Sequence, residues 1–129
     1  MKIEHVALWT QNLERMRDFY VEFFDGKSNA KYTNPKKGFE SYFITFNSGA
    51  RLEIMRQAAI PANRNDVDEQ YIGLIHVAMS VGSRAGVDEL TNELRAAGYR
   101  VVSEPRETGD GYYESCVLDP DGNRVEIVA

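Results

Sequence analysis

The strongest constraint on the fold is an internal repeat. Residues 51–55 read RLEIM and residues 124–128 read RVEIV, so Glu53 and Glu126 occupy matching positions 73 residues apart. A second match joins IEHVAL at residues 3–8 to LIHVAM at residues 74–79, which places His5 and His76 71 residues apart. Two short matches with nearly the same spacing predict two copies of one unit, each with a His near its start and a Glu near its end.

The order of predicted elements agrees with a duplication. Apolar alternation, helical periodicity and turn residues predict a β-α-β-β-β order in each half. The first half combines strands at 2–9, 28–34, 39–46 and 50–57 with a helix that begins after the N-cap Asn12 and ends at Asp25-Gly26. The second combines strands at 73–81, 99–103, 112–118 and 124–128 with a helix between the N-cap Ser83 and Gly98. Pro105 is expected to stop the strand at 99–103. We therefore expect an α+β protein of one domain, residues 1–129, with modules 1–57 and 73–129 and a linker at 58–72.

Composition excludes several classes of function. The chain has 129 residues and a net charge of −5, which disfavours nucleic acid as a partner. Its apolar runs are far shorter than the roughly 18 residues that a membrane span needs, and its N-terminus lacks the apolar stretch of a signal peptide, so we expect a cytoplasmic protein without a membrane partner. The single cysteine, Cys116, is expected to be a small core residue.

The duplicated His and Glu predict a metal site. Strand alternation sets His5 and His76 opposite the apolar side chains of their strands, and Glu53 and Glu126 likewise. If the halves pair by pseudo-symmetry, within one chain or across a dimer, these two imidazoles and two carboxylates meet at one point. Such a set suits a divalent metal: nickel, zinc or cobalt, with iron or manganese as alternatives. The metal would polarise a carbonyl and stabilise an enediolate, and a ligating Glu would move the proton.

At these residues the chain resembles the vicinal oxygen chelate superfamily, which includes glyoxalase I, bleomycin-resistance proteins and extradiol dioxygenases. The resemblance covers the whole chain and rests on segments 5–8, 13–20, 52–54, 76–78 and 119–127. It implies paired βαβββ modules that form a cupped mixed sheet, a homodimer and a small-molecule substrate. The His-Glu-His-Glu pattern resembles glyoxalase I most, which implies a lyase that isomerises a hemithioacetal of a 2-oxoaldehyde. Glu126 would be the proton-transfer base and Glu53 its partner across the metal.

The chain also departs from the glyoxalase I pattern. Trp9 stands where that enzyme usually has an arginine that holds the glutathione carboxylate, and Gln57 stands where it usually has an asparagine. Trp9 and Met55 share the strand face of His5 and Glu53, so they are candidate substrate-binding residues, and Gln57 is a third as the possible substitute for the asparagine. The sequence supports metal chemistry better than it supports glutathione as the thiol. Two other readings stay open: a metal-free drug-binding protein of the bleomycin-resistance type, and an epimerase or dioxygenase with altered ligands.

Overall fold

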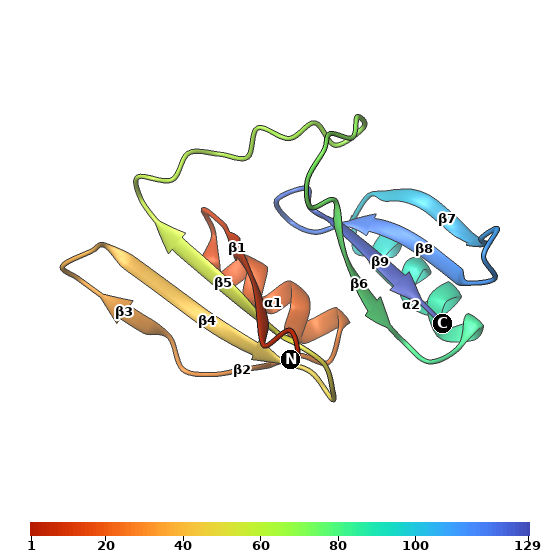
Figure 1. Cartoon of the computed structure of the whole chain (residues 1–129), viewed down its shortest axis with the longest axis horizontal. Helices are drawn as coiled ribbons and strands as arrows, with labels where there is room; N and C mark the ends of the chain where they lie inside the picture. The colour runs from red at the N-terminus through yellow and green to blue at the C-terminus, as the bar shows by residue number, and fades with distance from the viewer. The chain divides into compact units, whose positions relative to one another are not determined.

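The computed structural model describes all residues, 1–129, and divides into two compact units, residues 1–64 and 65–129. Each unit consists of one β-sheet with one α-helix packed against it (Figure 1). The mixed α+β class predicted from the repeat is confirmed, with one sheet in each unit. The assignment of both modules to a single domain stays a prediction.

The first unit holds a sheet in the order β1-β5-β4-β2, with β3 also paired to β4. Its elements are β1 (His5–Trp9), α1 (Leu13–Phe23), β2 (Lys27–Ser28), β3 (Tyr32–Asn34), β4 (Phe39–Thr45) and β5 (Arg51–Gln57). The first and last strands, β1 and β5, run parallel, and all other pairs are antiparallel. The crossover between the parallel strands contains α1, as a parallel pair requires.

The second unit repeats this topology, with the sheet order β6-β9-β8-β7. Its elements are β6 (His76–Ser80), α2 (Arg84–Ala96), β7 (Val101–Glu107), β8 (Tyr113–Leu118) and β9 (Arg124–Val128). Again the first and last strands, β6 and β9, run parallel. In both units the residue just after the first strand extends this pairing: Thr10 N donates to Met55 O at 2.9 Å, and Val81 N donates to Val128 O at 2.8 Å.

Each helix covers the apolar face of its own sheet. In the first unit, α1 buries Leu13, Met16, Phe19 and Tyr20 against a sheet face that carries Ile44, Leu52 and Ile54. In the second, α2 buries Val87, Thr91 and Leu94, and the sheet contributes Val117, Val125 and Ile127. Burial of these side chains is the main stabilising term of each unit.

Both predicted helix starts are confirmed. Asn12 Oδ1 accepts a hydrogen bond from Arg15 N at 3.1 Å, and Ser83 Oγ accepts one from Gly86 N at 3.1 Å. Each bond satisfies one of the amide groups that the first turn of a helix leaves without a partner.

The first strand of each unit begins three residues later than predicted, at His5 and His76, and two other strand predictions were also wrong in extent. The strand predicted at 28–34 is two short strands, β2 and β3, because Asn29 interrupts the ladder: its side-chain oxygen accepts from Phe43 N at 2.8 Å. The strand predicted to stop before Pro105 continues to Glu107. β7 is an edge strand whose pairing is irregular between Ser103 and Arg106, so the missing amide of Pro105 removes no regular ladder bond.

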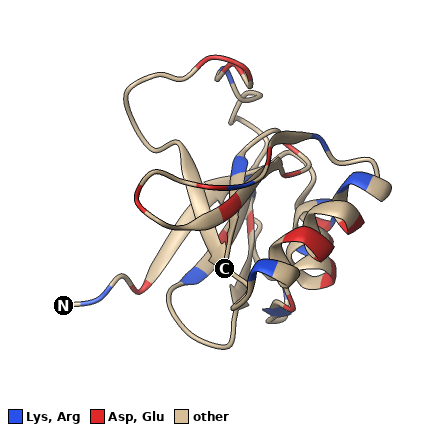
Figure 2. Cartoon of the chain, turned by 90° about the vertical axis from the view of Figure 1, so that its right-hand side faces the viewer, with Lys and Arg blue, Asp and Glu red and all other residues tan.

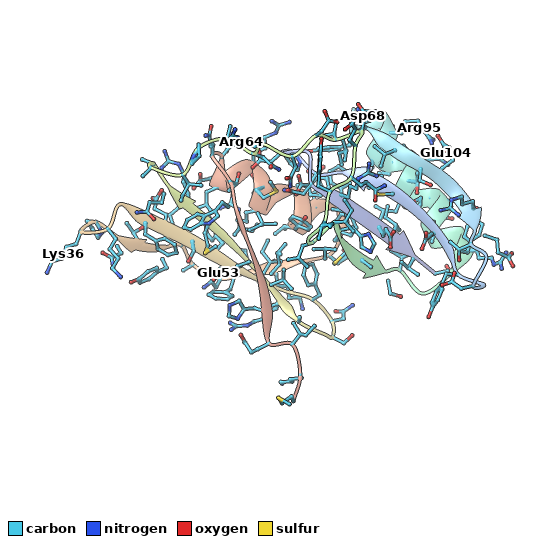
Figure 3. All side chains as sticks on the ribbon, turned by 45° about the horizontal axis from the view of Figure 1, so that its top comes forward. Lys36, Glu53, Arg64, Asp68, Arg95 and Glu104 are labelled. Atoms are coloured by element: carbon cyan, nitrogen blue, oxygen red, sulfur yellow. The ribbon has the colours of Figure 1, made fainter.

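Charged positions are dispersed over the chain. The ribbon coloured by charge shows basic and acidic segments interspersed on the elements (Figure 2). Many of these residues form surface ion pairs, such as Arg95 on α2 with Glu104 on β7, which lie side by side in Figure 3. Neither helix is long and apolar enough to cross a membrane.

Candidate functional site

A His–Glu pair lies on the sheet of the first unit, on the face opposite α1. Ala7 on β1 pairs with Glu53 on the parallel strand β5, so His5, two residues before Ala7, shares the face of Glu53. The imidazole Nε2 of His5 lies 3.9 Å from Oε2 of Glu53. The Glu53 side chain is largely buried, at 15% exposure, and is marked on the sheet in Figure 3.

The second unit carries the same pair in the same register. Ala78 on β6 pairs with Glu126 on the parallel strand β9, and His76 again lies two residues before the alanine. Its Nε2 lies 3.2 Å from Oε2 of Glu126, whose side chain is 21% exposed. The structure thus brings each predicted histidine to the predicted glutamate of its own unit.

Around His5 the structure shows contacts that were not predicted from the sequence. The imidazole Nδ1 contacts Oε2 of Glu4, and the other oxygen of Glu4 accepts from Nη2 of Arg51. The Arg51 guanidinium lies 4.2 Å from the centre of the Phe43 ring, whose edge-on contact with His5 joins ring centres 5.5 Å apart. The hydrogen bond from His5 is the main cause that lowers the pKa of Glu4. Phe43 could have been predicted from the hairpin turn at 47–49, which sets residues 43 and 53 opposite each other. The two residues pair directly in the β4–β5 ladder.

Around Glu126 the surroundings differ. Burial raises the pKa of the Glu126 carboxyl and outweighs the opposite effect of His76. Cys116 pairs with Glu126 in the β8–β9 ladder, is 7% exposed, and has a thiol pKa that burial raises. Cys116 is therefore a buried residue, as predicted. Arg124, the counterpart of Arg51, donates to the carbonyl of Val67 at 2.8 Å.

The predicted substrate-binding residues lie on the face of the first sheet that carries His5 and Glu53. Trp9 pairs with Met55 across β1 and β5, and Gln57 follows two residues later on the same face. Trp9 is 40% exposed and contacts the Phe39 ring edge-on, with ring centres 6.1 Å apart. Gln57 Nε2 donates to the carbonyl of Lys37 at 3.2 Å, so this amide is engaged with the turn before β4.

The distance between the donor atoms of each pair can be compared with the distance between two ligands of one metal. Two donors held at about 2.1 Å from one metal, with their bonds near a right angle, lie about 3 Å apart. The 3.2 Å between His76 and Glu126 matches this spacing, and the 3.9 Å between His5 and Glu53 is somewhat wider. Neither unit by itself gathers three or more His, Cys, Asp or Glu side chains that could hold a metal.

A family model and a relative each match nearly the whole chain. The model of the glyoxalase/bleomycin resistance protein/dioxygenase superfamily matches residues 2–127. A Bacillus subtilis (strain 168) relative, the uncharacterized protein YqjT, is 30% identical over 130 residues, which cover 98% of this chain and 98% of that protein.

Solved structures show the same fold. A superfamily domain from Frankia sp. EAN1pec has a TM-score of 0.82 at 20% identity, over 99% of this chain and 96% of that one. The trypanothione-dependent glyoxalase I of Leishmania major has a TM-score of 0.77 at 22% identity, over 99% and 86%. A Zea mays glyoxalase I variant has a TM-score of 0.80 at 21% identity over 98% of this chain, which spans only 44% of the maize chain. By its family match, its duplicated sheets and its relative in Bacillus subtilis, this chain belongs to the glyoxalase/bleomycin resistance protein/dioxygenase superfamily.

Proposed function

We propose that this protein is a metal-dependent lyase of the glyoxalase I type. Its substrate would be a small oxygenated compound, such as the hemithioacetal of a 2-oxoaldehyde. His5, Glu53, His76 and Glu126 are proposed as the ligands of one divalent cation, nickel, zinc or cobalt, with iron or manganese as alternatives. We also propose that the protein acts as a homodimer.

The observation that carries this proposal is the repetition of one His–Glu pair in one register. A single His beside a Glu on a sheet is a common surface feature. Here the two residues face each other on the first and last strands of both units, at 3.9 Å and 3.2 Å. Two nitrogen and two oxygen donors suit these metals and leave positions for substrate in a five- or six-coordinate sphere.

The bound cation would supply Lewis acidity, which lowers the energy of negative charge on a substrate oxygen. The side chains would carry out the proton transfer. Glu126 takes the proton from the substrate carbon that bears the hydroxyl and the thioether, and returns it to the adjacent carbon. The hydroxyl proton passes to the former carbonyl oxygen, so the product is a 2-hydroxy thioester and no redox partner is needed. Glu53 is proposed as the second carboxylate, beside His5.

The substrate side of the proposal concerns Trp9, Met55 and Gln57. Trp9 and Met55 offer an apolar wall on the same sheet face as His5 and Glu53. The Leishmania major glyoxalase I depends on trypanothione, so thiols other than glutathione serve in this fold. The thiol used by this chain is therefore to be identified by comparing several thiols.

Metal uptake is the first test. Protein stripped of metal should bind close to one nickel, cobalt or zinc ion for each set of four ligands, measured by titration calorimetry and elemental analysis. His76→Ala and Glu126→Gln should each weaken this uptake, whereas Glu107→Gln, an exposed carboxylate of the same unit, should not. Uptake below a tenth of an ion per chain would reject the proposal and favour the metal-free drug-binding reading.

Turnover is the second test. Hemithioacetals of methylglyoxal with several thiols should be converted by the metal-loaded protein, followed by absorbance. Glu126→Gln should abolish conversion, and Glu53→Gln should leave residual activity if Glu126 is the base. Metal uptake without conversion of any hemithioacetal would favour an epimerase or dioxygenase.

A further inference from the structure

We propose that Glu4 is a positioning residue for His5. It holds the imidazole in one tautomer and one orientation, with Nε2 free and turned toward Glu53. This inference rests on the proposed function for its purpose, because the free Nε2 is the atom that would bind the metal. The geometry of the contact stands without it.

The contact between Glu4 and His5 fixes which ring nitrogen carries the proton. An ionised carboxylate only accepts hydrogen bonds, so the contact between Glu4 Oε2 and His5 Nδ1 makes Nδ1 the donor. A neutral imidazole carries one proton, so Nε2 is then left with its lone pair. That nitrogen is the one that lies 3.9 Å from Glu53. Glu4 and Glu53 thus occupy opposite sides of the same ring.

Glu4 is itself held in place. Its second oxygen accepts from Nη2 of Arg51, and its backbone carbonyl accepts from Arg51 N at 3.0 Å. The Arg51 guanidinium lies over Phe43, and Phe43 contacts the His5 ring. The contacts form a closed circuit from His5 through Glu4, Arg51 and Phe43 back to His5. A carboxylate whose other oxygen is bound by a guanidinium orients a histidine better than a freely rotating one.

The second unit lacks this circuit, which shows that it is not a by-product of the repeat. Ile75 stands at the position that corresponds to Glu4, so the residue before His76 offers no carboxylate. Arg124, which corresponds to Arg51, donates instead to the carbonyl of Val67. Only the His5 half of the proposed metal site is therefore organised in advance by a neighbouring acid.

The first measurement uses metal-free protein and needs no activity. Two-bond nitrogen-15 correlation spectra of the imidazoles at neutral pH should show His5 with its proton on Nδ1. In Glu4→Ala the nitrogen-15 chemical shifts of His5 should move toward the averaged values of exchanging tautomers. In Glu4→Gln, whose amide oxygen can still accept a hydrogen bond, the shifts should lie between those of Glu4→Ala and the natural chain. Glu4 is exposed, so the sheet should stay folded. An unchanged His5 pattern in Glu4→Ala would overturn the proposal.

The second measurement is metal affinity by competition with a chelating dye. Glu4→Ala should bind nickel or zinc about 10- to 100-fold more weakly than the natural chain. The matched control is Glu40→Ala, which removes the comparable Glu40–Arg56 ion pair of the same sheet at 3.1 Å and should change affinity less than twofold. Equal affinities for Glu4→Ala and the natural chain would overturn the proposal. If the natural chain binds no metal, the proposed function fails, and the tautomer of His5 still decides the role of Glu4.

Discussion

Cys116 lies directly opposite Glu126 across the antiparallel strands β8 and β9, so a thiol and a carboxylate share one face of the second sheet. Burial disfavours the charged form of both groups and raises both pKa values. The second sheet therefore holds a carboxylate at some cost to its own stability, as is common where a protein keeps a reactive group.

The pKa of Glu126 leads to a prediction for stability against pH. The pKa of Glu126 is higher in the folded protein than in the unfolded chain, so the folded protein binds the proton more tightly. Protonation of Glu126 therefore stabilises the fold at low pH, and this stabilisation is lost as pH rises through the folded pKa. Glu126→Gln stays neutral and avoids that loss. We expect metal-free Glu126→Gln to gain stability relative to the natural chain between pH 4 and pH 7, measured by urea unfolding. The exposed control Glu107→Gln should show no such gain. If Glu126→Gln became less stable than the natural chain toward pH 7, the raised pKa of Glu126 would be contradicted.

The thiol of Cys116 gives the second prediction. A buried thiol with a raised pKa is neutral at pH 8 and shielded from reagents, so it should be a poor nucleophile. We expect native protein to react with Ellman's reagent at least tenfold more slowly than protein unfolded in urea at the same pH. Rapid labelling of the native chain would show that this strand opens or that the thiol is activated.

The helix caps give the third prediction. Asn12 and Ser83 each accept one hydrogen bond from the first turn of their helices, both at 3.1 Å. Asn12→Ala and Ser83→Ala should each lower the free energy of unfolding by about 1 kcal/mol. Replacement by glycine at the same positions should cost only a few tenths of a kcal/mol, because glycine caps helices nearly as well. Alanine variants as stable as the natural chain would rule out a capping role.

The faces of the strands could be predicted because side chains alternate with a period of two residues. Once His5 and Glu53 are assigned to strands with apolar neighbours, their shared face follows from the residues that must be buried. The duplicate supplied an independent check, since the same assignment had to hold for His76 and Glu126. The structure places both pairs as alternation requires.

The parts that the sequence did not reveal depend on specific polar contacts. Asn29 splits a strand because its amide takes the place of a backbone acceptor, and no periodicity encodes that choice. Pro105 is accepted because β7 lies at the edge of its sheet, a position known only once the strand order is known. Glu4 adjoins His5 in the sequence, yet its importance appears only when Arg51 and Phe43 are brought beside it.

The end of helix α1 gives the last prediction, because Asp25 and Gly26 exchange the roles that the sequence indicates. A glycine after a helix usually takes a positive φ, but here Asp25 does so, at 52°. Gly26 is required for space instead: a Cβ atom there would lie 2.6 Å from Cγ2 of Ile44 and 2.8 Å from the carbonyl oxygen of Tyr20. Both neighbours belong to a packed core and cannot move freely.

Gly26→Ala should therefore lower the free energy of unfolding of the first unit by about 1–3 kcal/mol. Asp25→Gly should be neutral or stabilising by up to about 1 kcal/mol, because glycine relieves the positive φ. Gly109→Ala is the matched control, since its Cβ would meet nothing within 4 Å and its φ is not positive. Urea unfolding of the three variants separates the two explanations. If Asp25→Gly proved costly and Gly26→Ala harmless, the close approach of Ile44 would not be what selects glycine here.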